Sequence, residues 1–221
     1  MNVLDFTHIL HKNIPVFPGD DPPEFFSHCT LEKDGFLETR LNISSHTGTH
    51  MDAPAHMIKG GAFLNQFSLE KYMGTGIVVH VPDNCPGQTI GTENLSFLES
   101  YRGKIDFVLL YTGWSRFWGQ ERYLLDFPVL TAEAAQRLSD FNLKGIGTDT
   151  ISIDPMSSED FENHRIFMTR NILIIENLAN LSAAPRGTFP FFCIPLSFEK
   201  ADGSPVRAFT YLPASGSLES I

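Results

Sequence analysis

The sequence contains few cysteines, and they form no pattern. Cys29, Cys85 and Cys193 are spread over 221 residues, and no two of them make a C-x-x-C motif. An odd number of isolated cysteines is typical neither of a disulfide framework nor of a thiolate zinc site. We therefore expect three reduced, mostly buried thiols, and this expectation favours a cytoplasmic location.

Long apolar runs and clusters of positive charge are also missing. No stretch approaches the roughly 20 apolar residues of a membrane span, and the first residues lack the basic and apolar regions of a signal peptide. The formal net charge is −10, from 16 basic and 26 acidic residues, and no run of Lys or Arg relieves it. We therefore expect neither a nucleic acid nor a membrane as a partner.

The apolar content suits one core. The hydrophobic fraction is 42%, and the length fits a single domain over residues 1–221. Short runs rich in β-branched and aromatic residues predict strands at 3–10, 36–45, 75–82, 105–112, 143–148, 171–176, 188–198 and 206–212. Helices are predicted at 93–101, 132–141 and 158–168, with N-terminal caps at Thr92, at Thr131 and at Ser157 or Ser158.

The order of these elements predicts an α/β fold. Strand and helix alternate through residues 75–148, which is typical of a βαβ core with parallel strands, and the flanking strands are expected to be antiparallel. In residues 36–45, Leu37, Thr39, Leu41 and Ile43 share one face of the strand. Pro190 and Pro195 predict that the strand at 188–198 is irregular or at an edge. We expect a single mixed-sheet domain.

One short segment concentrates groups that bind metals or transfer protons. Residues 46–56 read HTGTHMDAPAH and contain His46, His50, Asp52 and His56, separated only by small or apolar residues. Pro54 resists a helix, so we expect a loop or a single turn at the end of the strand at 36–45.

Two His and one Asp make three protein ligands, which is the arrangement of a catalytic metal site rather than a structural one. Zinc, manganese and iron(II) all accept such ligands. A catalytic metal of this kind lowers the pKa of bound water and so provides a nucleophile near neutral pH.

Two more side chains are candidate ligands. Glu176 ends the apolar run NILIIE, where an ionised carboxylate is costly if it is buried without a partner. His164 lies on the helix predicted at 158–168. Taken alone, each residue is better explained as a side chain in water, and the ligand interpretation stays open at this point.

The long motif resembles the H-x-G-T-H-x-D-x-P-x-H signature of the metal-dependent cyclase-like hydrolases, which include bacterial kynurenine formamidases (arylformamidases). The likeness extends to PVFPGD at 15–20, to GTDTISIDP at 147–155, to His164 with Glu176, and to ENLANL at 176–181. The resemblance implies a swivelling β/β/α domain, a homodimer or larger homo-oligomer, and two metal ions per chain, usually zinc, with manganese as the alternative.

The resemblance also implies roles for the site residues. His46, His50 and Asp52 would bind the first metal and His164 the second, and Asp52 and Glu176 would bridge both. His56 would be the proton shuttle. The reaction would be attack of metal-bound hydroxide on an N-formyl arylamide such as N-formylkynurenine, a small aromatic amide, with release of formate and an aromatic amine.

Phe17 departs from the family pattern. Kynurenine formamidases typically carry Trp there, and that Trp contacts the aromatic substrate. Phe17 keeps an aromatic face without an N–H donor, so N-formylkynurenine itself is in question. Phe17 either binds substrate or only packs, and the sequence favours neither interpretation.

Two other functions are alternatives. The first is hydrolysis of a related cyclic amide, lactam or ester. Isatin hydrolase, a relative that uses manganese, has Gln where this chain has Glu176, so Glu176 favours the two-metal type. The second alternative is a non-catalytic metal- or ligand-binding protein. His56 argues against it, because a structural site needs no additional imidazole.

Overall fold

Eight strands form one mixed sheet in the computed structural model, which describes residues 2–81 and 89–212. Their order is β1 (Asn2–Asp5), β12 (Gly203–Leu212), β11 (Thr188–Pro195), β5 (Met73–His80), β7 (Phe107–Tyr111), β9 (Gly145–Thr148), β10 (Leu173–Glu176) and β4 (His50–Asp52). Because β4 also pairs with β12, the strands from β12 to β4 close into a ring. The predicted α/β fold with a single mixed sheet is confirmed.

The centre of the sheet is parallel. Strands β5, β7, β9 and β10 run in one direction, and the other pairs of this sheet are antiparallel. Parallel neighbours need crossover connections. These contain the 3₁₀ helix η4 (Thr92–Tyr101) between β5 and β7, α2 (Ala132–Ser139) between β7 and β9, and α3 (Glu162–Met168) between β9 and β10. The predicted βαβ core is therefore confirmed.

The central strands β7, β9 and β10 are buried on both faces of the sheet. In β7, Val108 and Leu110 join the core that includes α2 and α3, whereas Phe107 and Leu109 join a second core with Phe191 of β11. Side chains alternate along a strand, so a strand covered on both faces reads as a continuous apolar run. This explains why β7 was recognisable as FVLLY.

Of the three predicted helix starts, the one at Thr131 is confirmed and the other two need correction. The Thr131 hydroxyl accepts a hydrogen bond from Ala134 N at 3.1 Å and caps α2 as predicted. The segment at 93–101 is a 3₁₀ helix that begins at Thr92, so Gly91 and not Thr92 occupies the capping position. Its amide donates to Asn94 Oδ1 at 3.1 Å, which closes the first turn.

Helix α3 begins at Glu162, four residues later than predicted. The Ser158 hydroxyl caps a local turn by accepting a hydrogen bond from Phe161 N at 3.0 Å. Phe161 then adopts a left-handed φ of 49°, which interrupts any helix running from residue 158. The Ser-rich segment is therefore a turn before the helix.

The edge position predicted for the strand at 188–198 is wrong. β11 lies between β12 and β5, inside the sheet. Pro195 is its last residue, where no further ladder bond is needed. Pro190 lacks an N–H, but its carbonyl still accepts a hydrogen bond from the Thr210 hydroxyl. One missing donor is tolerated because the other residues of β11 pair with β12 and β5.

The remaining predicted strands are present with shifted ends. β1 stops at Asp5, and the strand at 36–45 is β3 (Glu38–Asn42). The end of the predicted strand at 75–82 and Cys85 lie outside the described residues, whereas Cys29 and Cys193 are free thiols. The smaller elements are β6 (Thr89–Ile90), β8 (Val129–Leu130), η1 (Pro54–His56), η2 (Leu64–Gln66), η3 (Leu69–Tyr72), η5 (Trp114–Phe117), η6 (Glu121–Leu124) and η7 (Leu181–Ala183).

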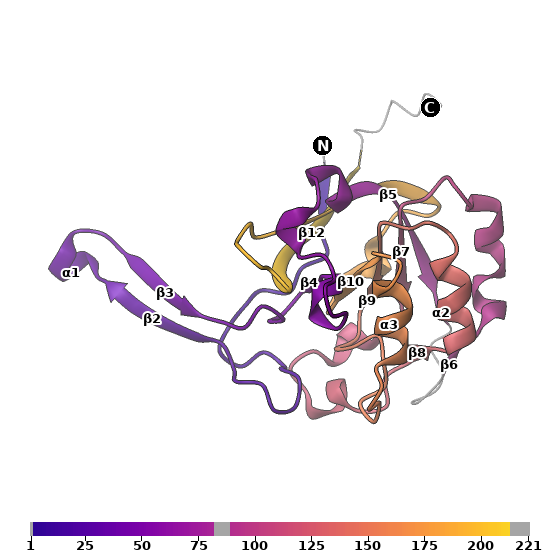
Figure 1. Ribbon diagram of the computed structural model, residues 1–221. Helices are drawn as coiled ribbons and strands as arrows, with labels where there is room; N and C mark the ends of the chain where they lie inside the picture. The colour runs from indigo at the N-terminus through magenta and orange to yellow at the C-terminus, as the bar shows by residue number, and fades with distance from the viewer. Residues whose placement is uncertain (1, 82–88, 213–221) are drawn as a thin grey trace.

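A long hairpin projects from the body of the molecule (Figure 1). We call it the arm: it consists of β2 (Glu24–Cys29), α1 (Leu31–Asp34) and β3, and Phe25 pairs with Leu41 across it. The alternation predicted for β3 is present, but every residue of that strand is exposed. The arm leaves six large apolar side chains exposed, namely Phe25, Phe26, Leu31, Phe36, Leu37 and Leu41.

In the described parts of the chain, no helix is both long enough and apolar enough to cross a membrane.

Candidate active site

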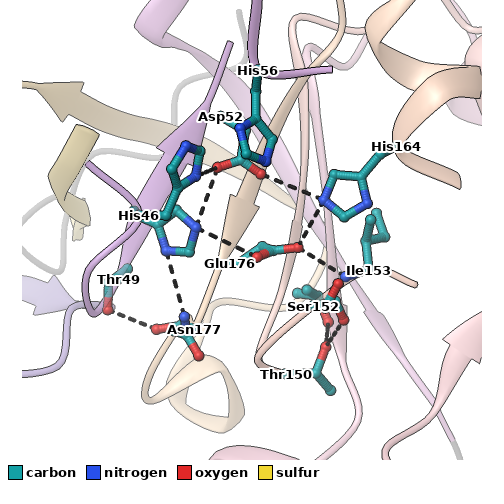
Figure 2. Close-up of polar contacts among 12 residues, drawn as sticks. His46, Thr49, Asp52, His56, Thr150, Ser152, Ile153, His164, Glu176 and Asn177 are labelled. Carbon is teal, nitrogen blue, oxygen red and sulfur yellow. Dashed lines mark hydrogen bonds and ion pairs between the residues drawn. The ribbon is translucent and has the colours of Figure 1, made fainter. Parts of the chain in front are cut away.

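Strands β4 and β10 bring three predicted ligands to one face of the sheet. They pair antiparallel, with Glu176 opposite His50 and Ile174 opposite Asp52. Since successive side chains point to opposite faces, Met51 and Ile175 enter the apolar core. His50, Asp52 and Glu176 therefore point together to the other face. Figure 2 shows Asp52 and Glu176 directed toward His164 of α3. Polar and apolar residues alternate in β4, which reads HMD, and Glu176 ends the apolar strand β10. This pattern places the three ligands on the same face.

The other two candidates come from neighbouring segments. His46 lies in the turn before β4, and its Nδ1 is 2.7 Å from Asp52 Oδ1. His164 projects from α3 toward Asp52 and Glu176 (Figure 2). It is only 3% exposed, which excludes the helix-surface interpretation. Glu176 is 5% exposed, so it is not a strand-end carboxylate in water either. The structure thus brings all five predicted ligands together.

The donor atoms are spaced as metal ligands are. His50 Nε2 lies 3.2 Å from Asp52 Oδ1 and 3.4 Å from Glu176 Oε2. His164 Nε2 lies 3.7 Å from Asp52 Oδ2 and 3.4 Å from Glu176 Oε1. Two ligands of a tetrahedral zinc ion, each about 2.0–2.1 Å from it, are about 3.4 Å apart. Each carboxylate also turns one oxygen to each imidazole.

The outer nitrogens of these rings are held by the protein. His50 Nδ1 donates to Gly48 O at 2.8 Å, and His164 Nδ1 donates to Asp154 Oδ2 at 2.6 Å. Asn177 Nδ2 supports the same carbonyl of Gly48 at 2.9 Å. In a neutral ring, such a bond puts the proton on Nδ1 and leaves the Nε2 lone pair for a metal. Both rings therefore fit the role of ligand.

Three overlapping groups of side chains could hold metal ions. They are His46, His50 and Asp52; Asp52, His164 and Glu176; and, at the edge of the site, His46, His56 and Asp202. Within each group the ligand atoms lie within 4.8 Å of one another. Asp52 belongs to the first two groups, which is the arrangement of a bridging carboxylate.

Protons balance the charge of this site. Burial would lower the pKa of His50, but Asp52 and Glu176 beside it raise that pKa to about 10. Burial would raise the pKa of Asp52, but His50 and His46 hold it well below its usual range. The pKa of His164 is likewise well above normal despite its burial, because it bonds to Asp154, Asp52 and Glu176. A divalent cation would replace these protons.

His56 lies at the edge of the site and is the last residue of η1 (Pro54–His56). Its ring centroid is 4.0 Å from that of His46 and 6.4 Å from that of His164. Burial lowers the pKa of His56. A neutral imidazole beside the carboxylates can accept a proton near neutral pH. This position agrees with a proton-transferring role.

Asp202 was not predicted from the sequence. It precedes β12, and its Oδ2 lies 3.3 Å from His46 Nε2 and 3.9 Å from His56 Nδ1. The next residue, Gly203, allows this approach: a Cβ there would lie 2.5 Å from His46 Cε1. Asp202 therefore joins the two imidazoles on the side away from Asp52.

The site forms the floor of a pocket of about 580 Å³. Its apolar walls contain Phe17, Met57, Ile151 and Phe161. Phe17 also packs against the cluster around Ile151, so it has both of the positions that the sequence left open. A separate cavity of about 670 Å³, next to His8, holds none of the predicted site residues.

Sequence reasoning also missed Asp154 and Phe161. Asp154 lies within the GTDTISIDP segment that resembles the family, so a signal for it existed. Phe161 has no such signal, because its place in the pocket depends on the left-handed turn before α3. Asp202 had none either, because it lies 156 residues from His46 in the chain.

The fold and the site define a class of protein. Three-residue sets of imidazole and carboxylate, open to a pocket with a neutral His at its edge, are the arrangement of a metal-dependent hydrolase. Comparisons with known proteins agree. The family model described as putative cyclase matches residues 4–155. A kynurenine formamidase of Paracidovorax citrulli (strain AAC00-1) is 30% identical over 212 residues, which is 95% of this chain and 96% of that relative.

Solved structures share the fold. An isatin hydrolase bound to the product analogue thioisatinate matches with a TM-score of 0.83 and 24% identity, over 96% of this chain and 92% of that one. A potential metal-dependent hydrolase with cyclase activity matches with a TM-score of 0.78 and 27% identity, over 96% and 99%. The chain belongs to the putative cyclase family and is one of the metal-dependent hydrolases of that family. The family and enzyme class expected from the sequence are confirmed, and the non-catalytic alternative is set aside.

Proposed function

We propose that this enzyme hydrolyses an N-formyl arylamide, such as N-formylkynurenine, to formate and an aromatic amine. One observation carries the proposal: Asp52 and Glu176 each turn their two oxygens toward different imidazoles, on the floor of a pocket with aromatic walls. The likeness to a kynurenine formamidase along 95% of the chain supports the same reaction.

We propose two ions per chain, with zinc as the first choice and manganese as the alternative. His46, His50 and Asp52 would hold one ion and His164 the other, with Asp52 and Glu176 between them. Nitrogen and carboxylate donors suit both metals. When bound, the ions would supply a water of lowered pKa and stabilise negative charge on the acyl oxygen.

His56 would move the proton. It accepts a proton as water adds to the formyl carbon and passes it to the aryl nitrogen as the C–N bond breaks. Its lowered pKa keeps it neutral and ready to accept at neutral pH. Phe17 and Phe161 would contact the aryl ring and hold the formyl group over the floor of the pocket.

The second candidate substrate is a cyclic amide, as the name of the isatin hydrolase suggests for that relative. Both reactions break an amide C–N bond, so the same residues would serve. The buried carboxylate of Glu176, which favours two cations over one, supports the formamidase reaction in preference.

A substrate comparison tests the proposal. Purified protein, loaded with zinc or manganese, is incubated with formanilide, N-formylkynurenine and isatin, and formate and ring opening are measured. We expect formate from the two formamides and removal of activity by a chelator. Hydrolysis of isatin alone would support the second candidate, and no hydrolysis of any of the three would contradict both.

We also propose that residues 1–221 act as one hydrolase domain in a homodimer or larger homo-oligomer, in the cytoplasm. The apolar arm supports assembly, because its exposed Phe and Leu side chains gain stability when a second copy covers them. Light scattering tests it: we expect at least twice the monomer mass for the native chain and a monomer for the Phe26→Asp, Leu37→Asp variant. A monomeric native chain would contradict the proposal.

A further inference from the structure

Two charged residues line the pocket but have no part in the proposed chemistry. Arg165 follows His164 on α3. Asp20 ends a turn that begins at Phe17, and the amide of Asp20 donates to Phe17 O at 3.0 Å. Both side chains belong to the wall of the same 580 Å³ pocket whose floor holds Asp52 and Glu176. A substrate in this pocket therefore meets a cation and an anion in addition to the metal-binding groups.

The side chain of Arg165 is exposed, and no acidic side chain of the described residues pairs with its guanidinium. Its Nε donates to the Asp160 carbonyl at 2.8 Å. Among the described residues, its terminal nitrogens make no hydrogen bond and no ion pair. Those nitrogens present the two parallel donors that fit a carboxylate.

The carboxylate of Asp20 can also bind a ligand. Within residues 2–81 and 89–212, its carboxylate takes part in no hydrogen bond or ion pair, and in particular it does not pair with Arg165. Two opposite charges that share a pocket but remain apart leave room for a ligand with both charges. An α-amino acid group, with its carboxylate and its ammonium, is such a ligand.

We propose that Arg165 binds the carboxylate and Asp20 the ammonium of an amino-acid group carried by the aryl amide substrate. The inference rests on the proposed function, and it adds the charged end of the substrate and the residues that select for it. Phe17 and Phe161 line the same pocket as these charges and the site carboxylates, so the aryl ring would lie against them. A neutral aryl formamide would then bind through the ring alone.

Three probes separate the contributions. Formanilide has no charge, 2-formamidobenzoate adds a carboxylate, and N-formylkynurenine has a carboxylate and an ammonium. The native enzyme and the variants Arg165→Gln, Arg165→Lys and Asp20→Asn are compared, with metal content measured in every sample. Arg170→Gln is the matched control, because Arg170 lies just beyond α3 and pairs with Asp140 outside the pocket.

We expect Arg165→Gln to raise KM about ten-fold for both carboxylate probes, as loss of a charge-assisted hydrogen bond does, with kcat and the KM of formanilide unchanged. Arg165→Lys should restore part of the loss. Asp20→Asn should raise KM for N-formylkynurenine alone, and Arg170→Gln should change nothing. Equal effects of Arg165→Gln on all three probes, or none on any, would overturn the inference.

A binding measurement keeps this test independent of turnover. Calorimetric titration with 2-aminobenzoate, kynurenine and aniline reports the affinity for the product side even if no probe is hydrolysed. We expect Arg165→Gln to weaken 2-aminobenzoate and kynurenine about ten-fold and to leave aniline unchanged. If the native protein binds aniline as tightly as the two carboxylates, Arg165 does not select for charge. Absent hydrolysis with intact selectivity would contradict only the proposed reaction.

Discussion

His50 and Glu176 lie opposite each other on β4 and β10, with His50 Nε2 3.4 Å from Glu176 Oε2. β4 has only three residues and pairs with β10 on one side and with β12 on the other. The ligand set is therefore built on the strand that closes the ring of the sheet. Binding of metal and closure of the sheet should stabilise each other.

Removal of metal should therefore lower the melting temperature. A ligand present at about 100 times its Kd stabilises the folded state by about 2.7 kcal/mol per site, which for a chain of this size is about 5–10 °C. Differential scanning calorimetry with and without a chelator measures this.

Metal titration of the chelated protein should saturate at two equivalents, and Glu176→Gln should bind fewer. Saturation of the native chain at one equivalent would refute the two-ion proposal.

His56→Ala should separate catalysis from metal binding. His46, His50 and Asp52 already make a three-residue donor set without His56. A general acid–base group contributes about 10²–10⁴-fold to the rate, so kcat should fall by that factor at unchanged metal content. His46→Ala is the comparison and should lose both. A metal-depleted His56→Ala protein would make His56 a ligand, and a fully active one would make it a bystander.

Asp202→Ala should weaken metal binding without removing a ligand. Asp202 Oδ2 holds the outer nitrogen of His46 at 3.3 Å, and loss of such a partner typically costs about 10–100-fold in metal affinity or activity. Competition with a chromophoric chelator measures the affinity. Asp202→Asn keeps an oxygen acceptor and should restore most of it. Unchanged affinity in Asp202→Ala would show that the Asp202–His46 contact has no function.

Phe17→Ala distinguishes substrate binding from packing. If Phe17 contacts the aryl ring, KM for formanilide should rise several-fold with a smaller change in melting temperature, because one aromatic contact is worth about 0.5–1.5 kcal/mol. If Phe17 only packs against Ile151, melting temperature should fall and KM should not change. Phe17→Trp should retain activity, and improved turnover of N-formylkynurenine alone would indicate that the natural substrate is a different amide.

His8 should make stability depend on pH. Burial lowers the pKa of His8 to about 4, against 6.5 for an ordinary His, and its ring stacks on Trp118 at 3.8 Å. Between these pH values the unfolded chain binds more protons than the folded one. The free energy of unfolding should therefore be fully present above about pH 6.5 and should fall as the pH drops toward 4.

His8→Phe keeps the stacked ring and removes the titration. The native chain should lose about 1–2 kcal/mol more than His8→Phe between pH 6.5 and 4, a value reduced because the ring is partly exposed to water. Urea unfolding at several pH values measures the difference. Parallel curves for both proteins would show that protonation of His8 does not affect stability.

The sequence predicted the elements whose signal is local. β7 and β10 were recognisable because strands buried on both faces read as apolar runs. The His-rich segment was recognisable because His46, His50 and Asp52 lie within seven residues. For the same reason, the start of α3 was misplaced: Ser158 gives a helix-start signal, and the left-handed Phe161 that delays the helix gives none.

Features that depend on distant contacts were not predictable. Whether Glu176 is buried or in water depends on its pairing with His50, and that pairing is a property of the sheet. The interior position of β11 was missed because a proline such as Pro190 is typical of an edge strand. The sequence alone does not show that β12 and β5 pair with β11 on both sides. The exposed face of the arm has the same alternation as a buried one, so the sequence of β3 does not tell which it is.

The absence of a side chain at Gly203 also says something about relatives of this enzyme. The ring of His46 occupies the space in which any other residue would place its Cβ, 2.5 Å from Cε1. A homologue with a larger residue at this position cannot hold the first imidazole of the motif where it lies here, even with HTGTHMDAPAH intact. The glycine after Asp202 is therefore needed, far from the motif in sequence, for the first imidazole to take the position that it has here.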